Sequence, residues 1–145
     1  MKNTMTVTYL SIAGLLLLAI GGAILIAPHA FHGSNGISLG KNPNLLSEVR
    51  APGGLLSISS IVILIAVFRT QLRSTAVKLS VLVYGSFGAA RLVSIAFDGT
   101  PSPAIVGATV LELIVALLGL VILWQARAAN IALPDRSLVD TPAAP

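Results

Sequence analysis

Four long apolar runs, separated by short polar segments, dominate the pattern of the chain. They cover about residues 7–27, 49–68, 76–97 and 104–124. Each has roughly 20 residues, which at about 1.5 Å per residue spans the ~30 Å hydrocarbon core of a bilayer. The pattern therefore predicts an all-α membrane protein, an antiparallel bundle of four transmembrane helices. We expect one domain over residues 1–126 and a mobile cytoplasmic tail over 127–145.

The polar residues inside the second, third and fourth runs recur at helical spacing, so each run carries one small-and-polar face. These faces hold Arg50, Gly53, Ser57 and Ser60; Tyr84, Gly88, Arg91, Ser94 and Asp98; and Ala108, Thr109, Glu112, Ala116 and Gly119. Small residues let membrane helices approach closely, and hydroxyl groups can bond across the contact. We expect the three faces to meet in the outer half of the bundle.

Arg91 and Glu112 are charged groups inside the third and fourth runs. Counted from the tight turn "DGTPSP", they lie about 9 and 12 Å below the same membrane face, because an α-helix rises about 1.5 Å per residue. The sequence therefore predicts that they pair. Three interpretations stay open: Arg91 reaches the headgroups instead, the pair is purely structural, or the pair also lines a ligand or proton site.

Other polar residues lie near the outer boundary of the predicted membrane segments, and most of them have more than one possible role. Glu48 and Arg50 are either an interfacial charge pair or the rim of a pocket above Arg91 and Glu112. Asp98 either forms part of the turn after the third run or interacts with Arg91 and its polar neighbours. His29 and His32 have no third ligand at a suitable spacing, so we predict no metal site. The candidate ligand-binding set is Arg50, Ser57, Tyr84, Arg91, Ser94, Asp98 and Glu112, with Glu48 at the rim.

Composition supports a membrane location. Hydrophobic residues make up 55% of the 145-residue chain and charged residues 10%, against about 25% charged in soluble domains. The absence of cysteine excludes disulfides, thiol catalysis and cysteine-ligated metals. The first run is longer than a signal peptide's apolar region and no small-x-small cleavage site follows it, so we expect a retained helix.

The net charge of +4 reflects orientation rather than nucleic-acid binding. With four membrane spans, both termini and the loop between the second and third runs lie on one side of the membrane. Six lysine and arginine residues lie on that side, and two lie on the opposite side. The six are Lys2, Arg69, Arg73, Lys78, Arg127 and Arg136; the two are Lys41 and Arg50. By the positive-inside rule, both termini are predicted to be cytoplasmic, in an inner membrane, and residues 28–48 form a long outer loop.

The chain resembles a bacterial membrane family, domain-of-unknown-function family 4345, which is distantly similar to four-helix DoxX-like proteins. The resemblance rests on "LLLLAIGGAILIAP", "SEVRAPGGLL", "YGSFGAARLVSIAFDGTPS" and the acidic residue in "VLELIVALLGL". The matching positions are Arg50, Gly53, Gly54, Arg91, Asp98, Gly99, Pro101 and Glu112; Pro52 stands where the family often has an aromatic residue. The resemblance implies a fold and an outer polar cluster, and no activity.

We therefore predict a small integral inner-membrane protein with an accessory or interaction role. The alternative is a small-molecule or lipid binding or transport protein, in which Arg91 holds an anionic group and Glu112 accepts a proton. A third interpretation, an enzyme acting on lipids with Glu112 as acid or base, lacks any catalytic signature. No cofactor and no nucleic acid are predicted. The expected partners are the bilayer, a small anionic or lipid ligand, and a second copy or another membrane protein.

Overall fold

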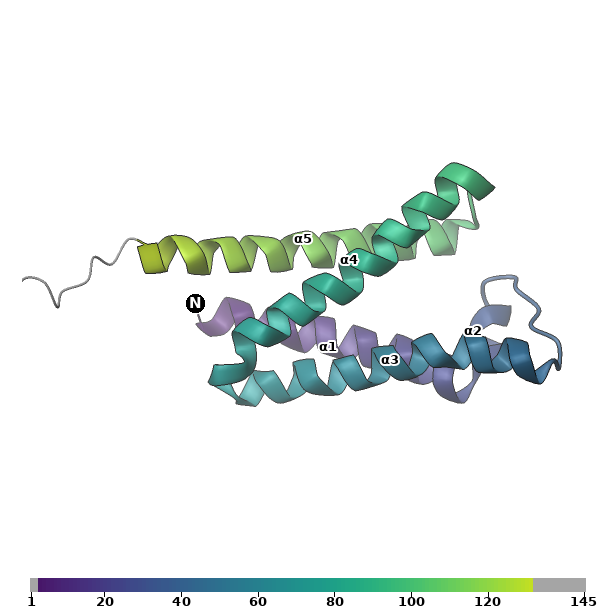
Figure 1. The fold of residues 1–145 in the computed structure, drawn as a ribbon, viewed down its shortest axis with the longest axis horizontal. Helices are drawn as coiled ribbons and strands as arrows, with labels where there is room; N and C mark the ends of the chain where they lie inside the picture. The colour runs from purple at the N-terminus through teal and green to yellow at the C-terminus, as the bar shows by residue number, and fades with distance from the viewer. Residues whose placement is uncertain (1–2, 132–145) are drawn as a thin grey trace, which may run out of the picture.

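The computed structural model describes residues 3–131, and all regular structure in that range is helical (Figure 1). The helices are α1 (Asn3–Ile26), α2 (Pro28–Gly33), α3 (Pro43–Phe68), the 3-10 turn η1 (Thr70–Leu72), α4 (Arg73–Asp98) and α5 (Pro103–Ile131). Four of them are long and apolar enough to cross a membrane. The predicted all-α class is thereby confirmed, with four helices that are long and apolar enough to span a membrane.

The four long helices form two closely packed pairs. α1 lies along α3, and α4 lies along α5, while contacts between the pairs are fewer. α4 crosses the molecule obliquely, so it diverges from α3 and approaches α5 towards one end (Figure 1). We call this the α2 end, because it holds α2 and the α4–α5 turn; the opposite end, where η1 joins α3 to α4, is the η1 end.

Close contact within each pair depends on glycines. A Cβ atom on Gly21 of α1 would lie 2.7 Å from the backbone nitrogen of Ser57 in α3. On Gly88 of α4 it would lie 2.8 Å from Leu113 Cδ2 in α5. The small-residue faces expected from the sequence are therefore contact surfaces between helices, where backbones approach each other.

The connection between α1 and α3 is more structured than the predicted loop over 28–48. Residues 28–33 form helix α2, and α3 begins at Pro43, six residues before the predicted start at 49. Asn42 caps α3 through a 2.9 Å bond from the Asn44 backbone nitrogen to its Oδ1 atom, and Pro43 fits the first turn, where no amide donor is needed. Because of this cap and this proline, the helix begins at Pro43 although residues 42–48 are mostly polar.

At the η1 end, α4 begins at Arg73 and α5 continues to Ile131. The predicted limits were 76 for the first and 124 for the second; the segment after Trp124 stays helical because Gln, Ala and Arg are good helix formers. Arg73 donates from Nη2 to the Val67 carbonyl oxygen at 2.8 Å, which satisfies a carbonyl at the end of α3. The rest of the predicted tail lies outside the described residues, as do Lys2 and Arg136.

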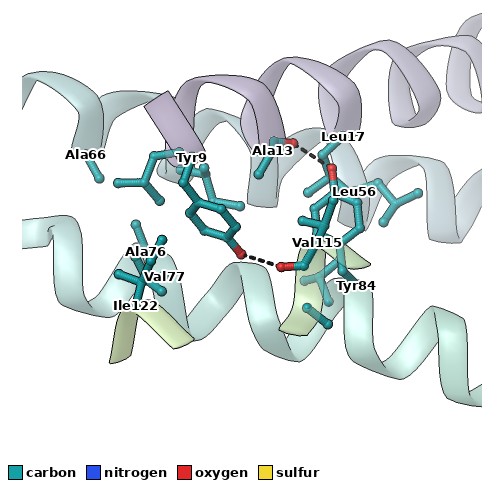
Figure 2. Close-up of a cluster of buried hydrophobic side chains, with 14 of the residues drawn as sticks. Tyr9, Ala13, Leu17, Leu56, Ala66, Ala76, Val77, Tyr84, Val115 and Ile122 are labelled. Atoms are coloured by element: carbon teal, nitrogen blue, oxygen red, sulfur yellow. Dashed lines mark hydrogen bonds between the residues drawn. The ribbon is translucent and has the colours of Figure 1, made fainter. Parts of the chain in front are cut away.

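Two tyrosine hydroxyl groups tie the helix pairs together in the buried core (Figure 2). Tyr9 of α1 donates to the Val115 carbonyl oxygen of α5 at 3.1 Å and also shares a 2.9 Å bond with Ser80 of α4. Tyr84 of α4 donates to the Ala13 carbonyl oxygen of α1 at 2.6 Å. Because lipid offers no hydrogen-bond partners, such bonds fix how the two pairs face each other.

Candidate functional site

The charged pair predicted inside the bilayer is present. Arg91 Nε lies 3.1 Å from Glu112 Oε2 and 3.3 Å from Oε1, so one guanidinium nitrogen is shared by both carboxylate oxygens. Gly88, one turn before Arg91, makes this possible. A Cβ atom there would lie 3.6 Å from the Cβ of Glu112 and closer still to Leu113, so glycine allows α5 to approach α4 at this level.

The pair lines a small cavity between the two helix pairs. Its apolar lining is contributed by four helices: Leu17, Ile20 and Ile24 of α1, Phe31 of α2, Leu56 of α3, and Val83 and Phe87 of α4. Tyr84, Arg91 and Glu112 complete the wall. The volume of about 40 Å³ holds a few water molecules or a short piece of one alkyl chain. A mostly apolar cavity with a charged pair in its wall suits an amphiphilic molecule.

The two charges differ in exposure. The side chain of Arg91 is 35% exposed and that of Glu112 is 11% exposed. Within the described part of the chain, the bonds of Arg91 to other residues all come from Nε, so both terminal amino groups of the guanidinium keep their donors available. Glu112 therefore holds Arg91 in place without saturating it, and a fixed guanidinium with open donors can bind a carboxylate or phosphate.

Tyr84 lies in the cavity wall, as its place on the polar face suggested. Its hydroxyl group donates a hydrogen bond to the Ala13 carbonyl oxygen of α1. The apolar ring therefore lines the cavity, and the hydroxyl group takes part in the contact between α4 and α1.

The remaining predicted site residues lie apart from the cavity. Ser94 donates to Asp98 Oδ2 at 2.9 Å, and both are exposed near the end of α4. Arg50 is exposed and donates to the Leu25 carbonyl oxygen at 3.1 Å. Ser57 bonds within its own helix to Gly53. Glu48 is exposed, and neither it nor Arg50 lines the cavity of Arg91 and Glu112.

The rim expected from Glu48 and Arg50 is thus not formed above the charged pair. The polar face of α3 turns towards α1, its closest neighbour, and α4 diverges from α3 at this level. Asp98 precedes Gly99, whose φ of 95° lies in the left-handed region that favours glycine. Gly99 therefore supplies the backbone conformation with which α4 ends and the turn to α5 begins.

Among residues 3–131 no group of three or more histidine and acidic side chains could hold a metal ion. His32 Nδ1 contacts the Pro28 carbonyl oxygen at 3.0 Å.

Sequence reasoning missed Tyr9, Ser80 and the contribution of α2. A tyrosine this close to the start of a membrane helix resembles an interfacial anchor, which hides its buried role. The spacing of Tyr9, Ala13 and Leu17, which share one buried face, was the available signal. Phe31 reaches the cavity only because residues 28–33 form a helix that folds back against the bundle.

Comparison with known proteins bears on the same region. The sequence model of the family described as Domain of unknown function (DUF4345) matches residues 5–123. The chain belongs to this family. No curated protein and no solved structure matches it.

The region matched to DUF4345 contains the whole candidate site. It begins in the first turn of α1 and ends near Trp124 of α5, so it includes the four cavity-forming helices and the Arg91–Glu112 pair. The DUF4345 description carries no activity, and the function must be argued from the geometry of the site.

Proposed function

We propose that this protein binds a single-chain amphiphile with an anionic head in the cavity between its two helix pairs. The observation that carries the proposal is the place of Arg91: its guanidinium is held by Glu112 in the wall of a cavity whose other lining residues are mostly apolar. The chain of the ligand would lie between α1 and α4, and its carboxylate or phosphate would accept hydrogen bonds from the terminal amino groups of Arg91.

The shape of the cavity limits the ligand. Its volume of about 40 Å³ and its walls of leucine, isoleucine and phenylalanine suit one narrow alkyl or isoprenoid chain better than a fused ring system. A longer chain would extend out between α3 and α4, which diverge towards the α2 end, into the bilayer. Glu112 is too buried to meet water freely, so its role in this proposal is to orient Arg91.

The membrane arrangement that accompanies this proposal is an antiparallel four-helix bundle in an inner membrane with both termini in the cytoplasm. The distribution of lysine and arginine within residues 3–131 supports this orientation. The η1 end holds Arg69, Arg73, Lys78 and Arg127, whereas the α2 end holds Lys41 and Arg50. The excess at the η1 end favours a cytoplasmic side there. The ligand site would then open in the outer leaflet.

A second candidate is the accessory or interaction role, in which the charged pair is internal scaffolding. The observation in its favour is that Arg91 and Glu112 join α4 to its own closest neighbour, α5. An ion pair between adjacent membrane helices can fix their register without any ligand. In that case removing either charge lowers stability and changes no binding.

A binding titration separates the two candidates. Decanoate and decanol have equal chain lengths, and only decanoate carries an anionic head. The proposal predicts that the purified protein in mild detergent binds decanoate about 10- to 100-fold more tightly, because a hydrogen bond to a charged group contributes about 1.5–3 kcal/mol. R91Q should abolish this preference.

The matched control is R50Q, which removes a cation at the same end of the molecule that does not line the cavity. It should retain the preference for decanoate. Equal binding of decanoate and decanol by the wild type, or an unchanged preference in folded R91Q, would contradict the proposed function and favour the scaffolding role.

A further inference from the structure

A second cleft, bordered by two cations, lies at the η1 end, remote from the Arg91–Glu112 site. It has a volume of about 450 Å³ and is bounded by the first turns of α4 and the last part of α5. Ser74 and Lys78 come from α4, and Trp124 and Arg127 come from α5, with Leu120 and Leu123 forming its apolar part. Two cations from different helices thus border one cleft whose lining contains no acidic residue.

These two cations are not neutralised by the rest of the described chain. Among residues 3–131, neither Lys78 nor Arg127 has a hydrogen bond or an ion pair with another residue, and both side chains are exposed. Arg73, which is close in sequence, is instead bound to the end of α3. The cleft therefore carries an excess of about two positive charges that nothing in this range balances.

Trp124 places the cleft at a definite depth. It is 70% exposed, at the end of an apolar stretch of α5. Tryptophan in membrane proteins concentrates at the level of the lipid headgroups, because its ring is apolar and its indole N–H is a donor. Lys78 and Arg127 share the cleft with Trp124. We therefore expect their charged ends at the level of the lipid phosphates, and Leu120 and Leu123 beside an acyl chain.

We propose that this cleft binds the phosphate of an anionic membrane lipid, with Lys78 and Arg127 contacting the phosphate and Trp124 flanking the headgroup. Charge selects an anionic lipid over a zwitterionic one, since a zwitterionic headgroup brings no net charge to balance the two cations. Basic residues in a membrane-facing pocket between helices are a recognised arrangement for anionic headgroups. This site is independent of the proposed amphiphile site at the α2 end.

The experiment is a native mass spectrometry titration of the full chain with phosphatidylglycerol, compared with phosphatidylcholine. The variants are K78Q, R127Q and their combination. R69Q is the matched control, because Arg69 is an exposed cation of the same end that does not line the cleft. Removing one charge should weaken phosphatidylglycerol binding about fivefold, and removing both should weaken it roughly 25-fold.

The outcomes are distinct. Wild type and R69Q should bind phosphatidylglycerol equally and in preference to phosphatidylcholine, and inorganic phosphate at the same concentration should not compete. Equal loss in R69Q and in the single cleft variants, unchanged binding in the double variant, or equal binding of both lipids would overturn the proposal. Full competition by inorganic phosphate would also overturn it, since the cleft would then recognise a free anion. If the double variant fails to fold, K78Q and R127Q alone decide the result.

Discussion

At the scale of single residues, the hydroxyl groups of Tyr9 and Tyr84 and the charges of Arg91 and Glu112 occupy successive levels between the helix pairs. The tyrosines bond across the pairs, from α1 to α4 and α5, whereas the charged pair joins α4 to α5. The tyrosine contacts hold the pairs together towards the η1 end. At the α2 end α4 diverges from α3, and this is the end at which the proposed ligand would bind.

The change Tyr9→Phe tests the tyrosine contacts. It removes the bonds to Ser80 and to the Val115 carbonyl oxygen and keeps the ring in the core. We expect a loss of about 1 kcal/mol in the free energy of unfolding, the scale of interhelical hydrogen bonds in membranes. Unfolding in mixed micelles measures it.

Ser86→Ala is the control for this change. Its hydroxyl bonds only within α4, to the Leu82 carbonyl oxygen, and is exposed, so its unfolding free energy should stay within about 0.5 kcal/mol of wild type. A Tyr9→Phe protein as stable as the Ser86→Ala protein would show that the tyrosine bonds do not join the pairs.

At the scale of elements, adjacent glycines in α1 differ sharply in their surroundings. A Cβ atom on Gly21 would meet the Ser57 backbone nitrogen at 2.7 Å and Leu56 Cβ at 2.8 Å, whereas one on Gly22 would meet nothing within 4 Å. Backbone atoms cannot move aside as the tip of a side chain can. The separation of α1 and α3 is therefore set at Gly21.

Gly21→Ala should destabilise the protein by about 1–3 kcal/mol, the usual cost of overpacking a close contact. Gly22→Ala should be neutral or stabilise it by up to about 1 kcal/mol, because alanine is the better helix former. Unfolding of both variants in the same detergent gives the comparison. Equal effects of the two substitutions would refute the close approach of α1 to α3.

At the scale of the whole molecule, the orientation in the membrane can be tested cleanly, because the chain contains no cysteine. We expect a cysteine at Ser38, in the connection before α3, to react with a membrane-impermeant maleimide added to intact cells. A cysteine at Gln71, in η1, should react only after lysis. Labelling of the Gln71 position in intact cells would reverse the proposed topology.

The sequence predicts the four long helices and the Arg91–Glu112 contact because both depend on position along the chain alone. Helix length follows from apolar run length, and depth follows from the constant rise per residue. Whether Arg50, Ser57 and Glu48 line the cavity depends instead on the rotation of α3 about its axis and on the distance between α3 and α4. Packing between helices decides both, and the Tyr9 bonds that hold the pairs together arise from the same packing.

Native mass spectrometry of the gently extracted wild type, beside R91Q, E112Q and R50Q, tests whether Arg91 holds an amphiphile. We expect a stoichiometric amphiphile adduct on wild type and R50Q. The adduct should be weaker in folded E112Q, where Arg91 is no longer held, and lost from folded R91Q. An adduct retained in full by R91Q would contradict this expectation. So would an adduct-free wild type whose R91Q and E112Q variants merely unfold, since the charged pair would then be internal scaffolding.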